Sequence, residues 1–227
     1  MPVFRLTDAL IFPNPEFAEP DGLLAIGGDL SPSRLIMAYT QGIFPWFSED
    51  DPTLWWSPTP RLVLFPDEFH LPKRLRRTIT AGTFTVTADT AFAAIIAACA
   101  TASGRLENGT WITAEMQQAY CRLHELGFAH SIECWQEGRL AGGLYGVCLD
   151  QIFFGESMFT RVTDASKVAL AALVKQALHL NLAMIDCQMT TEHLLRFGTR
   201  ELSREMFQAQ LDAHISSCLP QQKWRLP

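Results

Sequence analysis

The spacing of apolar residues after residue 60 predicts strands and helices that follow one another along the chain. Strands are expected at residues 61–65, 83–88, 128–135, 139–149, 151–155 and 182–188. Helices are expected at residues 89–100, 113–126, 164–180 and 203–214. Each helix starts at a residue that favours the N-cap position, and these residues are Asp89, Thr113, Asp164 and Ser203.

The helix at 164–180 joins the strands at 151–155 and 182–188 in a strand–helix–strand unit. A right-handed crossover makes such strands parallel neighbours. The first strand runs into Glu156 and the second into Asp186 and Gln188. We therefore expect Glu156 and Asp186 to lie close together at the carboxyl ends of the two strands, where open α/β sheets bind ligands.

Residues 1–60 differ from the rest because they are rich in Pro, Gly and aromatic residues. They contain one clear predicted helix, with Ser31 as the N-cap, Pro32 in the first turn and Gly42 as the stop. We expect an α/β (α+β) protein with a small N-terminal α/β domain, residues 1–62, and a mixed-sheet domain, residues 63–227. The element order of the larger domain, β-α-α-β-β-β-α-β-α, resembles the acyltransferase fold of the GCN5-related N-acetyltransferases.

Charge and cysteine content narrow the class of protein. The chain has 18 Lys and Arg against 24 Asp and Glu, which excludes a basic protein that coats nucleic acid indiscriminately. Its 6 cysteines form no C-x-x-C pair and indicate reduced, buried thiols. No basic and apolar leader opens the chain, and the apolar run at 91–100 is too short to span a bilayer. We expect a soluble, cytoplasmic protein without a membrane partner.

Six motifs occur in an order that resembles one known family. They are LLAIGGDLS (23–31), GIFPWF (42–47), LWWSP (54–58), GGLYGV (142–147), GESMF (155–159) and IDCQ (185–188). From about Phe12 to Phe207 the chain is similar to the leucyl/phenylalanyl-tRNA–protein transferases. The resemblance implies a monomeric enzyme with an acyltransferase-like catalytic domain and no cofactor. Such an enzyme moves Leu, Phe or Met from aminoacyl-tRNA to the α-amine of an N-terminal Arg or Lys, which tags the acceptor protein for degradation.

Two stretches depart from the usual pattern of the family. Residues 190–193 read Thr-Thr-Glu-His where the family often has an Asn-Asp-His run, and residues 196–199 read Arg-Phe-Gly-Thr in place of a more usual Ser-Leu-Gly-Ala. Two other function classes stay open. One is a coenzyme A-dependent N-acyltransferase, although residues 155–164 lack the Gly-rich turn that would hold a pyrophosphate. The other is a module that binds N-terminal residues without chemistry.

Asp186, Gln188 and Glu156 are the predicted catalytic residues. A carboxylate such as Asp186 can hold the incoming amine and accept its proton, and the Gln188 carbonyl lies on the same strand face and can accept a second hydrogen bond. Glu156 can bind the guanidinium or ammonium of the acceptor's first side chain. The structural alternatives are a polar pair that caps the strand end and, for Glu156, a salt bridge to Lys167 or Arg161.

The donor side chain needs a dry hole, and apolar walls suit Leu, Phe or a stacked terminal adenine. The predicted substrate-binding residues lie in or beside the motifs and are Trp46, Phe47, Trp55, Trp56, Trp111, Leu144, Ser157, Met158 and Phe159. For each aromatic residue taken alone, ordinary core packing is the simpler interpretation.

A basic run is the predicted tRNA contact. Lys73, Arg74, Arg76 and Arg77 place four cations within five residues, and such a cluster binds backbone phosphates without reading bases. The alternative is a solvated face of the protein. The 6 histidines show no metal-ligand spacing, so we expect no metal.

Overall fold

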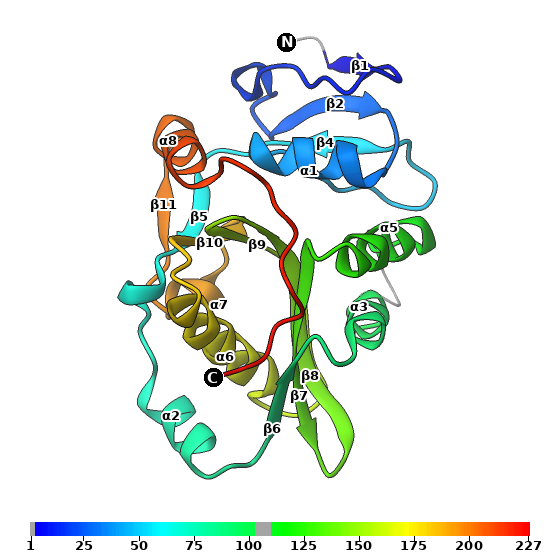
Figure 1. Ribbon diagram of the computed structural model, residues 1–227. Coiled ribbons are helices and arrows are strands. Elements are labelled where there is room, and N and C mark those ends of the chain that lie inside the picture. The colour runs from blue at the N-terminus through cyan, green and yellow to red at the C-terminus, as the bar shows by residue number, and fades with distance from the viewer. Residues whose placement is uncertain (1–2, 103–109) are drawn as a thin grey trace.

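The computed structural model describes residues 3–102 and 110–227, and Figure 1 shows a small sheet above a larger one. The small sheet has the strand order β1-β2-β4-β3. Its strands are β1 (Phe4–Leu6), β2 (Leu23–Gly27), β3 (Phe44–Pro45) and β4 (Leu54–Trp56). The sequence did not predict these strands because each is too short to show alternation.

Helix α1 (Pro32–Thr40) joins the small sheet to the rest of the molecule. It begins as predicted, because the Ser31 hydroxyl accepts a hydrogen bond from the backbone N–H of Arg34 at 3.4 Å. It ends before Gly42, whose φ of 70° is a conformation that glycine adopts without strain. The helix contacts β3 of the small sheet and also elements of the domain that follows residue 60.

The larger sheet has seven strands in the order β11-β5-β10-β9-β8-β7-β6. They are β5 (Arg61–Leu64), β6 (Thr85–Ala88), β7 (Ala129–Gln136), β8 (Arg139–Leu149), β9 (Ile152–Thr160), β10 (Met184–Gln188) and β11 (Arg200–Leu202). Strands β9 and β10 are parallel, which confirms the predicted crossover, and every other neighbouring pair in this sheet is antiparallel.

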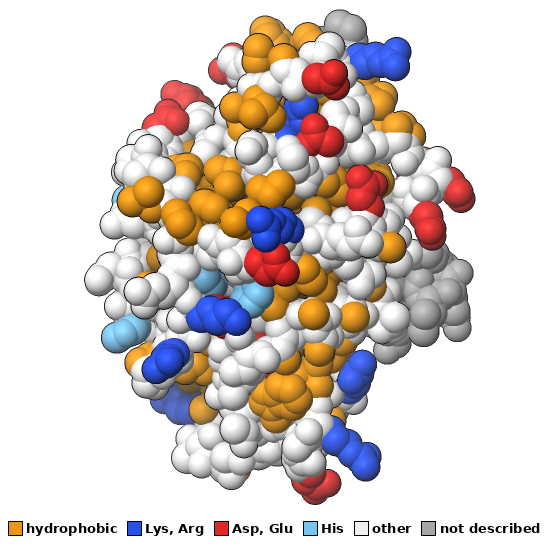
Figure 2. All heavy atoms as spheres, turned by 45° about the vertical axis from the view of Figure 1, so that its right-hand side comes forward, with side chains coloured by type: hydrophobic (Ala, Val, Ile, Leu, Met, Phe, Trp, Pro, Cys, Tyr) orange, Lys and Arg blue, Asp and Glu red, His pale blue; other side chains and the backbone are white. Residues whose placement is uncertain are grey.

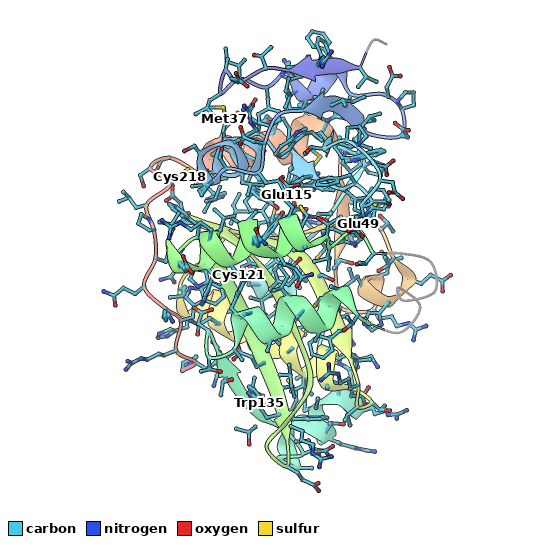
Figure 3. All side chains as sticks on the ribbon, turned by 90° about the vertical axis from the view of Figure 1, so that its right-hand side faces the viewer. Met37, Glu49, Glu115, Cys121, Trp135 and Cys218 are labelled. Atoms are coloured by element: carbon cyan, nitrogen blue, oxygen red, sulfur yellow. The ribbon has the colours of Figure 1, made fainter. Side chains whose placement is uncertain are left out.

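Helices cover both faces of the larger sheet. Helix α6 (Ala165–His179) packs on one face, and α3 (Phe92–Ala100) and α5 (Ala114–Glu125) pack on the other. Figure 3 shows α5, which carries Glu115 and Cys121, between α3 and the small sheet. The other helical segments within the described residues are α2 (Lys73–Thr80), α7 (Glu192–Leu195), α8 (Arg204–His214) and the 3-10 turns η1 (Pro15–Phe17) and η2 (Pro66–Glu68).

Of the four N-caps predicted after residue 60, three are confirmed in position and one is wrong. The hydroxyls of Thr113 and Ser203 accept backbone N–H groups at the starts of α5 and α8. Helix α3 instead starts at Phe92, because the Asp89 carboxylate is engaged in a buried cluster elsewhere. Asp164 precedes α6 with φ 71° and makes no capping hydrogen bond, because its carboxylate binds a lysine.

One hydrophobic cluster contains buried residues of both units. Strand β5 starts at Arg61 and pairs within the larger sheet, so the boundary predicted at residue 62 falls inside this strand. The ring of Tyr39 in α1 lies 5.1 Å from the ring of Phe154 in β9. The small unit therefore covers the larger sheet close to the point where β9 and β10 meet.

Candidate active site

The candidate site lies where β9 and β10 separate. Their pairing ends at Phe154 and Asp186, and β9 continues to Thr160. Glu156 was expected at a strand end but lies within the strand. It is the extra residue of a β-bulge, because its two neighbours pair with consecutive residues of β8. The separation of β9 from β10 and the bulge between β9 and β8 leave a space beside Glu156.

Gln188 joins the two predicted carboxylates. Its side-chain Nε2 donates to Oε1 of Glu156 at 2.9 Å, and its backbone N–H donates to Oδ1 of Asp186 at 2.8 Å. Gln188 has φ 62°, in the left-handed region, and its register with β5 is irregular. The structure thus brings the three predicted catalytic residues together in one hydrogen-bonded group.

Asp186 also forms a buried ion pair with Arg61 of β5. Nε of Arg61 lies 2.9 Å from Oδ1 and Nη2 lies 2.7 Å from Oδ2, with both side chains at most 1% exposed. The guanidinium also donates to the Gly42 carbonyl at 3.1 Å and lies against the rings of Phe44 and Phe207. Both oxygens of Asp186 are therefore engaged within the protein.

Glu156 is buried beside two tyrosines. Its Oε2 accepts a hydrogen bond from the Tyr120 hydroxyl at 3.0 Å, and the Tyr120 hydroxyl also contacts that of Tyr39. Burial raises the pKa of Glu156 to about 7, although the two tyrosine hydroxyls work in the opposite direction; the charge of Asp186 adds to the rise. A carboxyl with this pKa changes its protonation state near neutral pH.

The alternative salt bridge of Glu156 is not formed. The Lys167 ammonium lies 2.7 Å from Asp164, and the Arg161 guanidinium lies over the ring of Phe159. The Glu156 carboxylate instead accepts hydrogen bonds from the Tyr120 hydroxyl and the Gln188 side-chain amide.

A cavity of about 470 Å³ opens next to this group. Much of its wall is apolar and comes from β8, β9 and α6, including Leu144, Phe153, Met158, Leu170 and Leu173. Its polar residues come from the middle of β9, from β10 and from the segment that follows β10. Of the residues predicted from sequence, those that line the cavity are Trp46, Trp111, Leu144, Glu156, Ser157, Met158, Asp186 and Gln188.

Four predicted substrate-binding residues lie outside this lining. Phe47, Trp55 and Phe159 are buried in the core, and the Trp55 indole donates to the Gly27 carbonyl at 2.8 Å. Trp56 donates to the backbone carbonyl of Trp46 at 2.6 Å, and their rings meet edge to face. Trp56 thus supports a residue of the cavity wall.

Sequence reasoning missed Arg61, Tyr39 and Tyr120. A signal was available for Arg61, because an arginine that opens an apolar strand needs a partner when it is buried. The two tyrosines carried no such signal, since each lies on the apolar face of its helix. His193 and Thr191, from the stretch that departs from the family pattern, also line the cavity.

The basic run forms helix α2, which had been expected only as a basic stretch. Lys73, Arg74, Arg76 and Arg77 are exposed, and Leu75 between them is buried. Helix α2 packs against α6, so its cations lie on the side of the sheet that carries α6. On the face drawn in Figure 2, Lys and Arg side chains are spread among acidic and uncharged ones.

The described residues contain no group of three or more His, Cys, Asp or Glu side chains arranged to hold a metal ion. Within residues 3–102 and 110–227, no helix combines the length and the apolar character that crossing a membrane requires.

Solved structures give a weak likeness in overall shape. A GCN5-related N-acetyltransferase from Kribbella flavida is 11% identical with a TM-score of 0.39, and the match covers 76% of this chain and 61% of that chain. A conserved protein of unknown function from Staphylococcus epidermidis is 9% identical with a TM-score of 0.42, over 80% of this chain and 68% of that one. TM-scores of this size do not establish a shared fold.

Sequence relatives give a much closer match. A leucyl/phenylalanyl-tRNA–protein transferase of Syntrophobacter fumaroxidans is 54% identical over 99% of this chain and 96% of its own length. One from Anaeromyxobacter dehalogenans is 52% identical over 100% of this chain and 97% of its own length. Residues 63–212 match the family model described as leucyl/phenylalanyl-tRNA protein transferase, and residues 28–59 match that of its N-terminal domain. The chain therefore belongs to the leucyl/phenylalanyl-tRNA–protein transferase family.

Proposed function

We propose that this protein transfers Leu, Phe or Met from aminoacyl-tRNA to the α-amine of proteins that begin with Arg or Lys. The observation that carries the proposal is a cavity whose apolar wall meets the Glu156–Gln188 pair. The apolar wall suits the side chain of the donor amino acid. The polar residues lie where the ester carbonyl and the attacking amine would meet.

In this reaction the amine nitrogen attacks the ester carbonyl and an amide bond forms. The bond to the ribose oxygen breaks, the amine loses a proton, and the ribose oxygen leaves as a hydroxyl after it gains one. An α-amine has a pKa of about 8 and is roughly 10% neutral at pH 7, so positioning matters more than a strong base. Nε2 of Gln188 already donates to Glu156. Its Oε1 is then the atom that accepts a hydrogen bond from the amine.

Glu156 and Asp186 have different roles in this proposal. Glu156, with a pKa of about 7, is matched to taking up the proton that the amine loses. Asp186 holds the Gln188 backbone and is itself held by Arg61. We therefore assign Asp186 to positioning, which differs from the direct contact with the amine that the sequence suggested.

The proposal also covers tRNA binding, the oligomeric state, the location of the protein and its cofactor requirement. The exposed cations of α2, Lys73, Arg74, Arg76 and Arg77, are proposed to bind the phosphates of the tRNA. We also propose that the protein acts as a monomer in the cytoplasm and uses no cofactor, since the reacting ester is supplied already activated on the tRNA.

The decisive experiment supplies labelled Leu-tRNA and a set of acceptor proteins that differ only in their first residue. Transfer to proteins that begin with Arg or Lys, and not to the same protein beginning with Glu, is expected. A coenzyme A-dependent acyltransferase would instead use acetyl-CoA and gain thermal stability from it. A binding module would retain the Arg-initiated protein without consuming the ester.

A further inference from the structure

Two cations outside α2 lie close in the chain to residues that line the cavity, because Lys167 is three residues before Leu170 and Arg196 is two residues after Leu194. Lys167 is one helical turn before Leu170, which lines the cavity from α6. Its ammonium lies 2.7 Å from one oxygen of Asp164, and the other oxygen lies 3.9 Å from Nε of Arg74 in α2. Asp164 thus places a cation of the basic helix and Lys167 of α6 side by side.

His193 connects this pair to the cavity itself. It is one of the lining residues, and its ring meets the ring of Phe197 edge to face at 5.5 Å. Burial lowers the pKa of His193, and the positive charges of Lys167 and Arg196 lower it further. Arg196 is exposed and follows directly after α7.

Other lining residues are chemically different. Trp46 and Met189 also line the cavity, and both residues are more than one third exposed. A phosphate gains nothing from such a surface, whereas Lys167 and Arg196 attract one. An acceptor that begins with Arg or Lys carries at least two positive charges at that end and is repelled by the cationic side.

We propose that Lys167 and Arg196 bind the phosphates that link the last nucleotides of the donor's 3′ end, immediately before the ribose that carries the ester. This rests on the proposed function, since it assigns the donor's path into the same cavity. The cations of α2 then bind phosphates further along the tRNA, and Arg74 and Lys167 meet at Asp164. The acceptor enters from the side of Trp46 and Met189.

The test compares two donors that differ in phosphate. One is Leu-tRNA and the other is the leucyl ester of adenosine, which has the same reacting group and no phosphate. The variants are Lys167→Met and Arg196→Met, singly and together. Each is expected to lower kcat/KM with Leu-tRNA about five- to ten-fold and to leave transfer from leucyl-adenosine unchanged.

Salt dependence gives a second readout. With Leu-tRNA, each substitution should lower the slope of log KM against log salt concentration by about 0.7, the value for one phosphate contact on a single strand. Lys175→Met is the matched control, because Lys175 lies two turns further along α6 and donates to the Pro227 carbonyl at 3.0 Å. It should leave both donors and the slope unchanged.

The outcomes separate this proposal from the proposed function. An equal loss with both donors, or no loss with Leu-tRNA, would overturn the phosphate contact. Absence of transfer by the unsubstituted protein from both donors would overturn the function itself. Arg196 is exposed, so its variant keeps the test valid if Lys167→Met fails to fold.

Discussion

Two buried carboxylates in this molecule have opposite properties. Asp89 and Glu156 are both less than 10% exposed. Asp89 accepts hydrogen bonds from the ring of His130 at 2.7 Å and from the backbone N–H groups of Ser131 and Trp224 at 2.9 and 2.6 Å. Burial raises the pKa of Asp89, but these donors outweigh burial, and its pKa lies below the ordinary value.

Glu156 has weaker donors at the same depth. A tyrosine hydroxyl and the Gln188 amide bind it, and burial raises its pKa to about 7. The comparison shows that backbone N–H groups and an imidazole keep a buried carboxylate charged, whereas neutral side-chain donors leave it able to take a proton. The first arrangement suits a structural joint and the second suits proton transfer.

Substitution in the Gln188 group should have the largest effect. Gln188→Ala and Asp186→Asn are each expected to lower transfer by about 10²-fold or more, because the amine contact is lost or misplaced. Asp186→Asn should also destabilise the protein by about 3–5 kcal/mol, because Arg61 is left as an uncompensated buried charge. Transfer assays and urea denaturation measure the two effects.

A double variant separates positioning from stability. Arg61→Met with Asp186→Leu removes both charges, and stability should return towards that of the unsubstituted protein while transfer stays low. Near-normal turnover in either single variant, Gln188→Ala or Asp186→Asn, would remove that residue from the mechanism.

Substitution of Asp89 should lower the stability of the protein and leave its catalytic rate unchanged. Asp89→Asn removes the charge that holds His130 and the backbone of Trp224, and we expect a loss of about 1–3 kcal/mol in unfolding free energy. Well below the melting temperature, kcat/KM should remain within about two-fold of normal. A large loss of kcat/KM in the folded variant would show that the role of Asp89 is not purely structural.

The pH–rate profile sharpens the role of Glu156. Transfer should rise with pH through about 7 as Glu156 loses its proton, and again towards pH 8 as the acceptor amine does. Glu156→Gln should lower the rate about ten-fold and retain only the rise that belongs to the amine. An unchanged profile in this variant would exclude Glu156 as the proton acceptor.

The smallest effect concerns stability against pH. Glu156 has a folded pKa of about 7 and an ordinary value of 4.5, so between these values the folded state holds a proton that the unfolded state has lost. Its contribution to stability therefore falls as pH rises from about 4.5 to 7. Asp89 has a lowered pKa, so its contribution is present above pH 4 and lost as pH falls below.

Urea midpoints between pH 3 and 8 measure these slopes. Relative to the unsubstituted protein, Glu156→Gln should remove the decline between pH 4.5 and 7, and Asp89→Asn should weaken the acid limb. If both variants show parallel curves over the whole range, the two carboxylates do not titrate differently.

Local chemistry explains which features the sequence could predict. The caps Ser31, Thr113 and Ser203 act on backbone groups three residues away, so sequence alone sufficed. The same argument failed for Asp89, whose partners His130 and Trp224 are 41 and 135 residues distant. Asp89 suits an N-cap position but binds these partners in a buried cluster, and the local sequence does not reveal that cluster.

The candidate site shows the same division. The handedness of the crossover placed β9 beside β10, and with them Glu156 near Asp186. The bulge at Glu156 and the ion pair with Arg61, 125 residues from Asp186, depend on packing between distant segments. The aromatic residues could not be sorted into core and cavity for the same reason.

Arg61 has a consequence for how the protein is made. Its guanidinium contacts Gly42 before the larger sheet, Asp186 within β10 and Phe207 in α8. A growing chain cannot complete these contacts until nearly all of it has been synthesised. For the same reason, exchange of the first sixty residues between relatives should yield a working enzyme only where the graft preserves the fit around this one side chain.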